Sequence, residues 1–111
     1  MFSAHHSLKN LFFIIDNNKL QSIKSTSETL NLNDLKKKFS SFNIHTLECD
    51  GHNHAELKKC LNIFHASKPT VLIANTIKGK GVKFMENSVL WHYKYPNDEE
   101  LIEAIRDVKN A

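Results

Sequence analysis

Short apolar segments that alternate with helical patterns are the feature that most limits what this chain can fold into. Residues 11–15 form an unbroken apolar run of β-branched and aromatic side chains, which is typical of a strand buried on both faces. Residues 44–50 alternate in polarity and residues 69–75 are apolar through their centre, so both are predicted strands as well. Strands that are separated by helices pair in parallel, and we expect an α/β fold in which helices flank a partial parallel sheet.

Helix starts are predicted from polar residues that can cap a first turn and that precede apolar residues at three- and four-residue steps. Residues 1–10 are interpreted as the last turns of a helix that runs into the first strand. The Ser-, Thr- and Asn-rich residues 22–31 are interpreted as a loop. The predicted caps are Asn31 or Asn33 for a helix that ends near Phe42, Asn53 with Glu56 for the next helix, and Asn97 with Glu100 for the last.

Composition favours one globular domain, since 41% of the 111 residues are hydrophobic and 24% are charged. The net charge of +3 is mild, and the basic run Lys36, Lys37 and Lys38 is more typical of a solvated helix face than of a nucleic-acid interface. Cys49 and Cys60 have no Cys-x-x-Cys spacing, which favours a reducing, cytoplasmic setting. No apolar run reaches the length of a membrane span, and we expect no targeting segment and no membrane partner.

Polar residues that can bind a metal or a phosphate follow two of the predicted strands. In open α/β sheets ligands bind beyond the carboxyl ends of the strands, where Asn18 and the main-chain carbonyl of Leu20 are expected. Neutral oxygens of this kind suit Mg²⁺, although an Asp-Asn-Asn sequence after a strand is more often an ordinary turn. Lys78 opens a Gly-Lys-Gly turn that can approach an anion, which is a weak signal on its own. His92 lies among aromatic residues, where a packed core histidine is the more common interpretation.

Four segments together are more specific than any one of them. They are residues 16–21 (Asp-Asn-Asn-Lys-Leu-Gln), 48–52 (Glu-Cys-Asp-Gly-His), 76–82 (Thr-Ile-Lys-Gly-Lys-Gly-Val), and 84–92, which end in Trp-His and are followed by Pro-Asn-Asp-Glu-Glu at 96–100. In these segments and in their order the chain resembles transketolase. The similar part is the amino-terminal domain that binds thiamine diphosphate, above all where that domain is a separate subunit. The resemblance covers essentially the whole chain.

The resemblance implies a site for thiamine diphosphate and a divalent cation such as Mg²⁺. It implies that Asn18 and the main-chain carbonyl of Leu20 are metal ligands and that Lys78 faces the diphosphate of the cofactor. It also implies that His92 contacts the diphosphate near the substrate, where an imidazole of near-neutral pKa can transfer a proton. The reaction implied is the transfer of a two-carbon ketol unit between sugar phosphates.

The chain also departs from the family pattern. It contains no Gly-Asp-Gly motif, whose aspartate is a metal ligand in the family, and residues 1–111 resemble the carboxyl-terminal half of the diphosphate-binding domain. The implied partners are a transketolase carboxyl-terminal subunit or pyrimidine-binding domain, in a homo- or hetero-oligomer. A sheet that lacks some of its neighbours should leave residues 11–15 at an exposed apolar edge. Activity of this chain alone is therefore not expected.

Three alternatives remain open from the sequence. The chain could be a catalytically inactive, truncated remnant or a chain that only binds a partner. A small basic nucleic-acid-binding protein is suggested by the lysines at 36–38 and 78–83, although no nucleic-acid motif accompanies them. A histidine-rich metal protein is the weakest alternative, because the seven histidines share no ligand spacing.

Overall fold

The computed structural model describes residues 1–110 and divides into two compact units. The first unit comprises residues 1–17 and 32–76, and it contains the sheet. The second comprises residues 18–31 and 77–110. The segments of the second unit therefore begin within two residues of the ends of the two strands that finish at Asn17 and Asn75.

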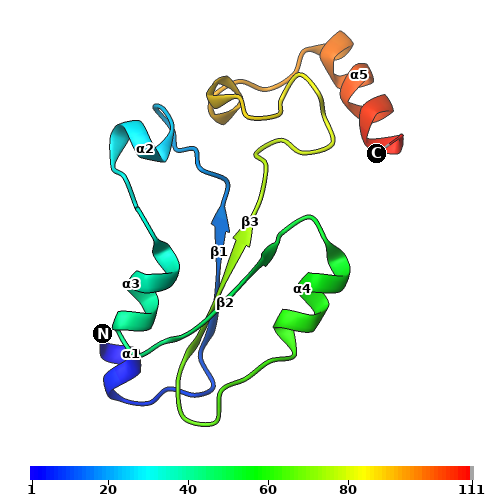
Figure 1. Ribbon diagram of the computed structural model, residues 1–111. Helices are drawn as coiled ribbons and strands as arrows, with labels where there is room; N and C mark the ends of the chain where they lie inside the picture. The colour runs from blue at the N-terminus through cyan, green and yellow to red at the C-terminus, as the bar shows by residue number, and fades with distance from the viewer. Residues whose placement is uncertain (111) are drawn as a thin grey trace. The chain divides into compact units, whose positions relative to one another are not determined.

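The first unit is built on a parallel sheet with the order β1-β3-β2. Its strands are β1 (Phe12–Asn17), β2 (His45–Asp50) and β3 (Thr70–Asn75). Helix α3 (Leu35–Ser41) lies in the connection from β1 to β2, and α4 (His54–Leu61) lies in the connection from β2 back to β3. Right-handed crossovers in opposite directions place these two helices on opposite faces of the sheet, as Figure 1 shows. The expected α/β architecture with flanking helices is confirmed.

The strand buried on both faces is β3, and the prediction that residues 11–15 fill this role is wrong. Val71 and Leu72 in β3 have no exposed surface, whereas 55% of Ile14 in β1 is exposed. The reason is topological, because β3 pairs with a strand on each side and β1 pairs only with β3 among the described residues. The exposed apolar edge expected at residues 11–15 is therefore present.

Helix caps follow the predicted chemistry at two of three places. The Asn53 side chain accepts from the backbone N–H groups of Ala55 and Glu56 at the start of α4. Asn97 and Glu100 form the predicted capping box of α5 (Asp98–Lys109). The predicted cap of α3 is wrong, because it is Asp34 rather than Asn31 or Asn33, whereas the predicted end near Phe42 is confirmed, since the helix ends at Ser41 with Phe42 as its C-cap. The remaining helices are α1 (Phe2–His5), α2 (Thr26–Thr29) and the 3₁₀ helix η1 (Val89–His92).

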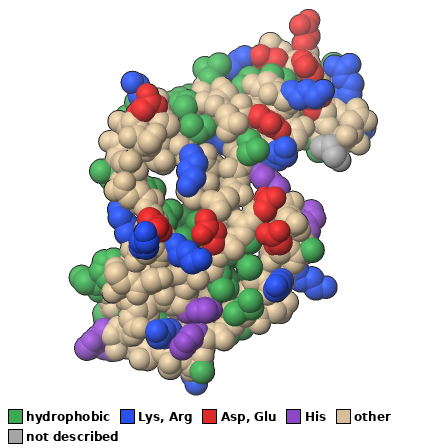
Figure 2. Space-filling model, viewed as in Figure 1, with side chains coloured by type: hydrophobic (Ala, Val, Ile, Leu, Met, Phe, Trp, Pro, Cys, Tyr) green, Lys and Arg blue, Asp and Glu red, His purple; other side chains and the backbone are tan. Residues whose placement is uncertain are grey.

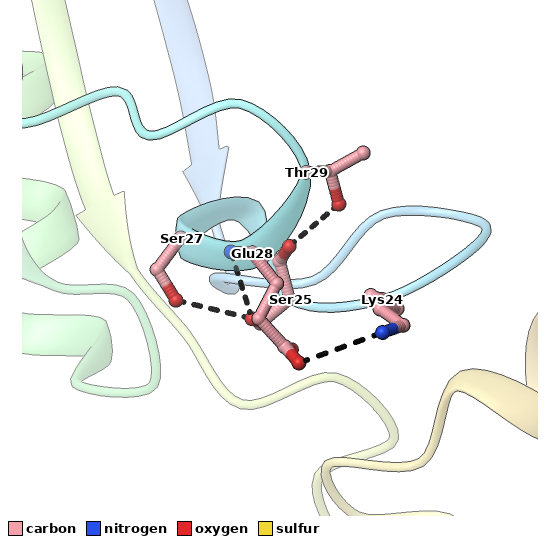
Figure 3. Close-up of polar contacts among 5 residues, drawn as sticks. All are labelled: Lys24, Ser25, Ser27, Glu28 and Thr29. Carbon is pink, nitrogen blue, oxygen red and sulfur yellow. Dashed lines mark hydrogen bonds and ion pairs between the residues drawn. The ribbon is translucent and has the colours of Figure 1, made fainter.

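Residues 22–31, predicted as a loop, contain the short helix α2 of the second unit (Figure 3). The Ser25 hydroxyl caps it by accepting from the N–H of Glu28, and it also donates to the Glu28 carboxylate. The hydroxyl of Thr29 donates to the carbonyl of Ser25 at 2.7 Å. Hydroxyl and carboxylate side chains at these spacings close a single helical turn, which overrides the loop-like composition of the segment.

Several surface features bear on the alternatives raised by the sequence. No helix within residues 1–110 is long and apolar enough to cross a membrane.

On the face drawn in Figure 2, lysine and arginine side chains lie intermixed with acidic ones instead of gathering by charge. Lys37 in the basic run is paired with Asp34 at 3.3 Å. Within residues 1–110, no three or more His, Cys, Asp or Glu side chains gather in a way that could hold a metal ion. The nucleic-acid and histidine-rich metal alternatives therefore gain no support from the structure.

A ladder of polar side chains joins the carboxyl ends of all three strands. The amide of Asn17 donates to the Asn75 side-chain oxygen at 2.8 Å, and the amide of Asn75 donates to Glu48 at 2.9 Å. Asn17 is only 8% exposed, so its amide depends on Asn75 for a partner. The ladder holds together the strand ends from which the two segments of the second unit depart.

Asn75→Ala should lower the free energy of unfolding by about 1–3 kcal/mol, because it leaves the buried amide of Asn17 without its acceptor. Glu48→Ala removes only the exposed end of the same ladder and should cost about 0.5 kcal/mol or less. Urea denaturation of the two variants measures both values. Equal losses for the two variants would show that the Asn17–Asn75 bond does not stabilise the sheet.

His45 should make the stability of the first unit depend on pH. Burial lowers the pKa of His45 below its ordinary value of 6.5, and the nearby charges of His65 and Lys68 lower this pKa further. The folded chain then binds a proton less readily than the unfolded chain. The contribution of His45 to the free energy of unfolding is fully present above about pH 6.5 and is lost as pH falls through the folded-state pKa. From about pH 7.5 to about pH 5, Tm should decrease more for the wild type than for His45→Gln, and equal decreases would contradict the assignment.

Candidate functional site

Four residues singled out in the sequence line one pocket of the second unit. Asn18, Leu20, Lys78 and His92, together with Gln21, surround a cavity of about 190 Å³. They come from two stretches of chain, residues 18–21 and 78–92, which are distant in sequence. The structure thus brings together all four residues that were predicted from the sequence to bind the metal or the cofactor. The roles of these residues remain predictions.

The turn at residues 18–20 orients its oxygen atoms through its own hydrogen bonds. The Asn18 Oδ1 atom accepts from the backbone N–H of Leu20 at 2.9 Å, and Lys19 between them has a φ of 63°. Leu20 also forms an antiparallel bridge with Ser25, whose hydrogen bonds run through the flanking residues. In this pattern the N–H and C=O groups of Leu20 point away from Ser25, toward the side on which its N–H meets Asn18. The amide oxygen of Asn18 and the carbonyl of Leu20 are therefore available on the same side of the turn.

The Lys78 main chain is held by the segment that follows the Gly-Lys-Gly turn. The carbonyl of Lys78 accepts from the backbone N–H of Asn87 at 3.0 Å. Gly79 has a φ of 74°, and a Cβ atom at this position would lie 2.6 Å from the carbonyl oxygen of Met85. Only glycine fits both the backbone angle and the close approach, so the turn is fixed at its base while the half-buried Lys78 side chain lines the pocket.

His92 ends the 3₁₀ helix η1 and is exposed, so the alternative of a packed core histidine is not supported. Its neighbour Trp91 packs instead. The Trp91 indole N–H donates to the carbonyl of Phe84 at 3.0 Å, and the rings of these two residues lie 5.1 Å apart. Trp91 anchors η1 and so places the His92 imidazole at the pocket.

The donor groups of the pocket suit an anion better than a bare cation. Its lining residues offer one ammonium group, one imidazole and two carboxamides, and none of them carries a carboxylate. Such a set can neutralise and hydrogen-bond phosphate oxygens. For a hard divalent cation it offers neutral oxygens, among them those of Asn18 and the main chain of Leu20, which fit as part of a coordination shell that needs further oxygen ligands.

Gln21 is the lining residue that the sequence analysis did not nominate. Its backbone N–H donates to the carbonyl of Lys24 at 3.0 Å, which closes the loop after Leu20. Gln21 could have been predicted as a lining residue from its position in the sequence, because it directly follows the predicted ligand Leu20 in the same motif.

Comparison with solved structures assigns the fold to that of transketolases. The chain superposes on the transketolase of Campylobacter jejuni with a TM-score of 0.88 and 26% identity, over 97% of this chain and 17% of that one. The transketolase of Leishmania mexicana gives a TM-score of 0.66 at 17% identity, over 98% of this chain and 20% of that one, which shows the fold alone.

Sequence comparison then identifies the family. Residues 1–108 match the model of the transketolase thiamine diphosphate binding domain, and the chain belongs to this family. It is 36% identical to one of the subunits of the apulose-4-phosphate transketolase of Actinobacillus succinogenes, over 97% of this chain and 40% of the relative. It is 31% identical to a 6-deoxy-6-sulfo-D-fructose transketolase subunit of a Clostridium species, over 98% of this chain and 40% of the relative. The chain thus spans well under half the length of these relatives.

Proposed function

We propose that this chain provides part of the diphosphate and metal site of a thiamine-diphosphate-dependent transketolase. The observation that carries the proposal is the convergence of Asn18, Lys78 and His92 on one pocket whose lining contains no carboxylate. Family membership supports thiamine diphosphate as the ligand, because the matching family is described by its binding of this cofactor.

Each residue of the pocket has a chemical role in this proposal. Asn18 and the main-chain carbonyl of Leu20 hold a divalent cation such as Mg²⁺ through neutral oxygens. Lys78 neutralises the diphosphate as a point charge. His92 hydrogen-bonds the diphosphate, and its imidazole can hold or release a proton near the reacting centre. Thiamine diphosphate supplies the carbanion chemistry when it is bound, and the protein supplies position and charge.

The proposal requires partners, because the sequence contains no Gly-Asp-Gly motif to provide a carboxylate ligand for the metal. Two relatives of the chain are named as subunits of transketolases, which supports assembly with a second polypeptide that carries the pyrimidine-binding domain. The substrates of those relatives, by their names, are a sugar phosphate and a sulfonated sugar. Two-carbon ketol transfer between sugar phosphates is the reaction we propose for the assembled enzyme.

Complementation tests this function. The 111-residue chain would be co-expressed with an upstream fragment that carries Gly-Asp-Gly and with a transketolase carboxyl-terminal subunit, and then assayed with thiamine diphosphate, Mg²⁺ and sugar phosphates. Activity that requires all three polypeptides, and that His92→Ala abolishes, is the expected result.

The main alternative is an inactive chain that only binds a partner, for which the exposed apolar strand β1 would be the contact surface. The same experiment separates the two functions. If the three polypeptides co-purify without activity while the carboxyl-terminal subunit is active with a complete amino-terminal subunit, the chain binds a partner without catalysis and the proposed function fails.

A further inference from the structure

The turn that carries Lys78 contains two more lysines, and the structure separates the three. Lys78 lines the pocket with Asn18 and His92. Lys80 and Lys83 line a different cavity of about 340 Å³ in the same unit, together with Glu86. The family resemblance singles out Lys78, but the local spacing of these lysines gives no physical reason for that choice, and the contacts of the turn supply one.

Glu86 makes the contacts that distinguish Lys80 from Lys78. Its Oε1 atom accepts from the backbone N–H of Gly81 at 3.2 Å and lies 3.7 Å from the Nζ atom of Lys80. The Glu86 side chain is 31% exposed, so these contacts are partly shielded from solvent. One carboxylate oxygen therefore holds the turn by its backbone and also draws Lys80 to itself.

The residues on each side of Glu86 hold the other part of the same turn. The N–H of Asn87 donates to the carbonyl of Lys78 at 3.0 Å, and Met85 presents its carbonyl against Gly79. The turn thus contacts three successive residues, and Glu86 is the one that contributes a side chain. Loss of this side chain would release Gly81 and Lys80 while the main-chain contact of Lys78 remained.

We propose that Glu86 is a positioning residue of the anion pocket, because its hydrogen bond to the Gly81 N–H fixes the turn in the form in which Lys78 lines the pocket. This inference rests on the proposed function, which supplies the diphosphate. Glu86 does not line that pocket, so it acts through the turn and not by contact with the ligand.

Isothermal titration of the 111-residue chain with inorganic diphosphate and Mg²⁺ tests the proposal. Glu86→Asp keeps the charge but is too short to reach Gly81, and it should weaken binding about tenfold. Glu86→Gln loses the partly exposed ion pair with Lys80, which contributes little, but keeps the length and an acceptor for the Gly81 N–H, and it should bind within about twofold of wild type. Glu103→Gln on α5 removes the same charge from the same unit and is the matched control, with binding expected to equal that of wild type. Circular dichroism melting verifies that each variant is folded.

A purely electrostatic role for Glu86 predicts the opposite order, because removing a negative charge near a basic pocket favours an anion. If Glu86→Asp binds like wild type, or Glu86→Gln binds as weakly as Glu86→Asp, the positioning role is overturned while the proposed function stands. If the wild-type chain alone binds no diphosphate, the same variants are titrated in the co-expressed three-polypeptide assembly, and only the absence of binding there overturns the proposed function and the positioning role together.

Discussion

Lys78→Ala should weaken the binding of inorganic diphosphate by about 10- to 100-fold, because it removes the one ammonium group that lines the described pocket. A charged hydrogen bond to a phosphate oxygen contributes more than a neutral one, and the half-buried position of Lys78 limits screening by solvent. The measurement is isothermal titration with Mg²⁺ present at constant ionic strength.

Lys80→Ala is the matched control for this prediction. It removes the same charge two residues away, from a side chain that lies against Glu86 and lines a different cavity. We expect its diphosphate affinity to fall by less than about threefold. Equal losses for the two variants would mean that the net charge of the turn, and not the placement of Lys78, determines binding.

Asn18→Ala should remove most of the benefit that Mg²⁺ gives to diphosphate binding. The wild-type chain should bind diphosphate more tightly with Mg²⁺ than with EDTA, and Asn18→Ala should reduce this ratio about tenfold. The variant loses an oxygen ligand and also the hydrogen bond that orients Leu20. Both losses act on the metal, so the affinity in EDTA should change much less.

Asn18→Asp provides the contrast to the alanine variant. It retains an acceptor for the Leu20 N–H and adds a carboxylate ligand, which the described pocket otherwise lacks. The Mg²⁺ benefit should therefore equal or exceed that of wild type. If Mg²⁺ still strengthens diphosphate binding to Asn18→Ala as much as it does for wild type, Asn18 is not a metal ligand.

The fold was largely predictable because periodicity reports which faces of an element are apolar. All three strands and the capping box at Asn97 follow from such local patterns. The central strand was assigned wrongly because burial on both faces depends on which strands pair, and the apolar run at residues 11–15 is compatible with an edge as well as a centre. The cap of α3 was missed by one residue. Asp34 accepts from the N–H of Lys37, and this interaction and those with the Lys37 side chain lower the pKa of Asp34.

The candidate site was predictable only through the resemblance. The motifs around Asn18, Lys78 and His92 are weak when taken alone, and their convergence depends on two chain segments that no local pattern connects. Glu86 was missed for a physical reason. The contact of Glu86 with Gly81 arises because the turn folds back on residues 85–87, and this return is set by close approach at Gly79 instead of by helix or strand periodicity.

Nuclear magnetic resonance tests the central claim most directly, because it reports where on the chain diphosphate binds. Titration of the isotope-labelled 111-residue chain with Mg²⁺ and diphosphate should shift the signals of the Asn18 amide, the Lys78 turn and the His92 ring with one common dissociation constant. Shifts that gather at the basic run 36–38, or that leave any of these three groups unchanged at saturation, would contradict the account.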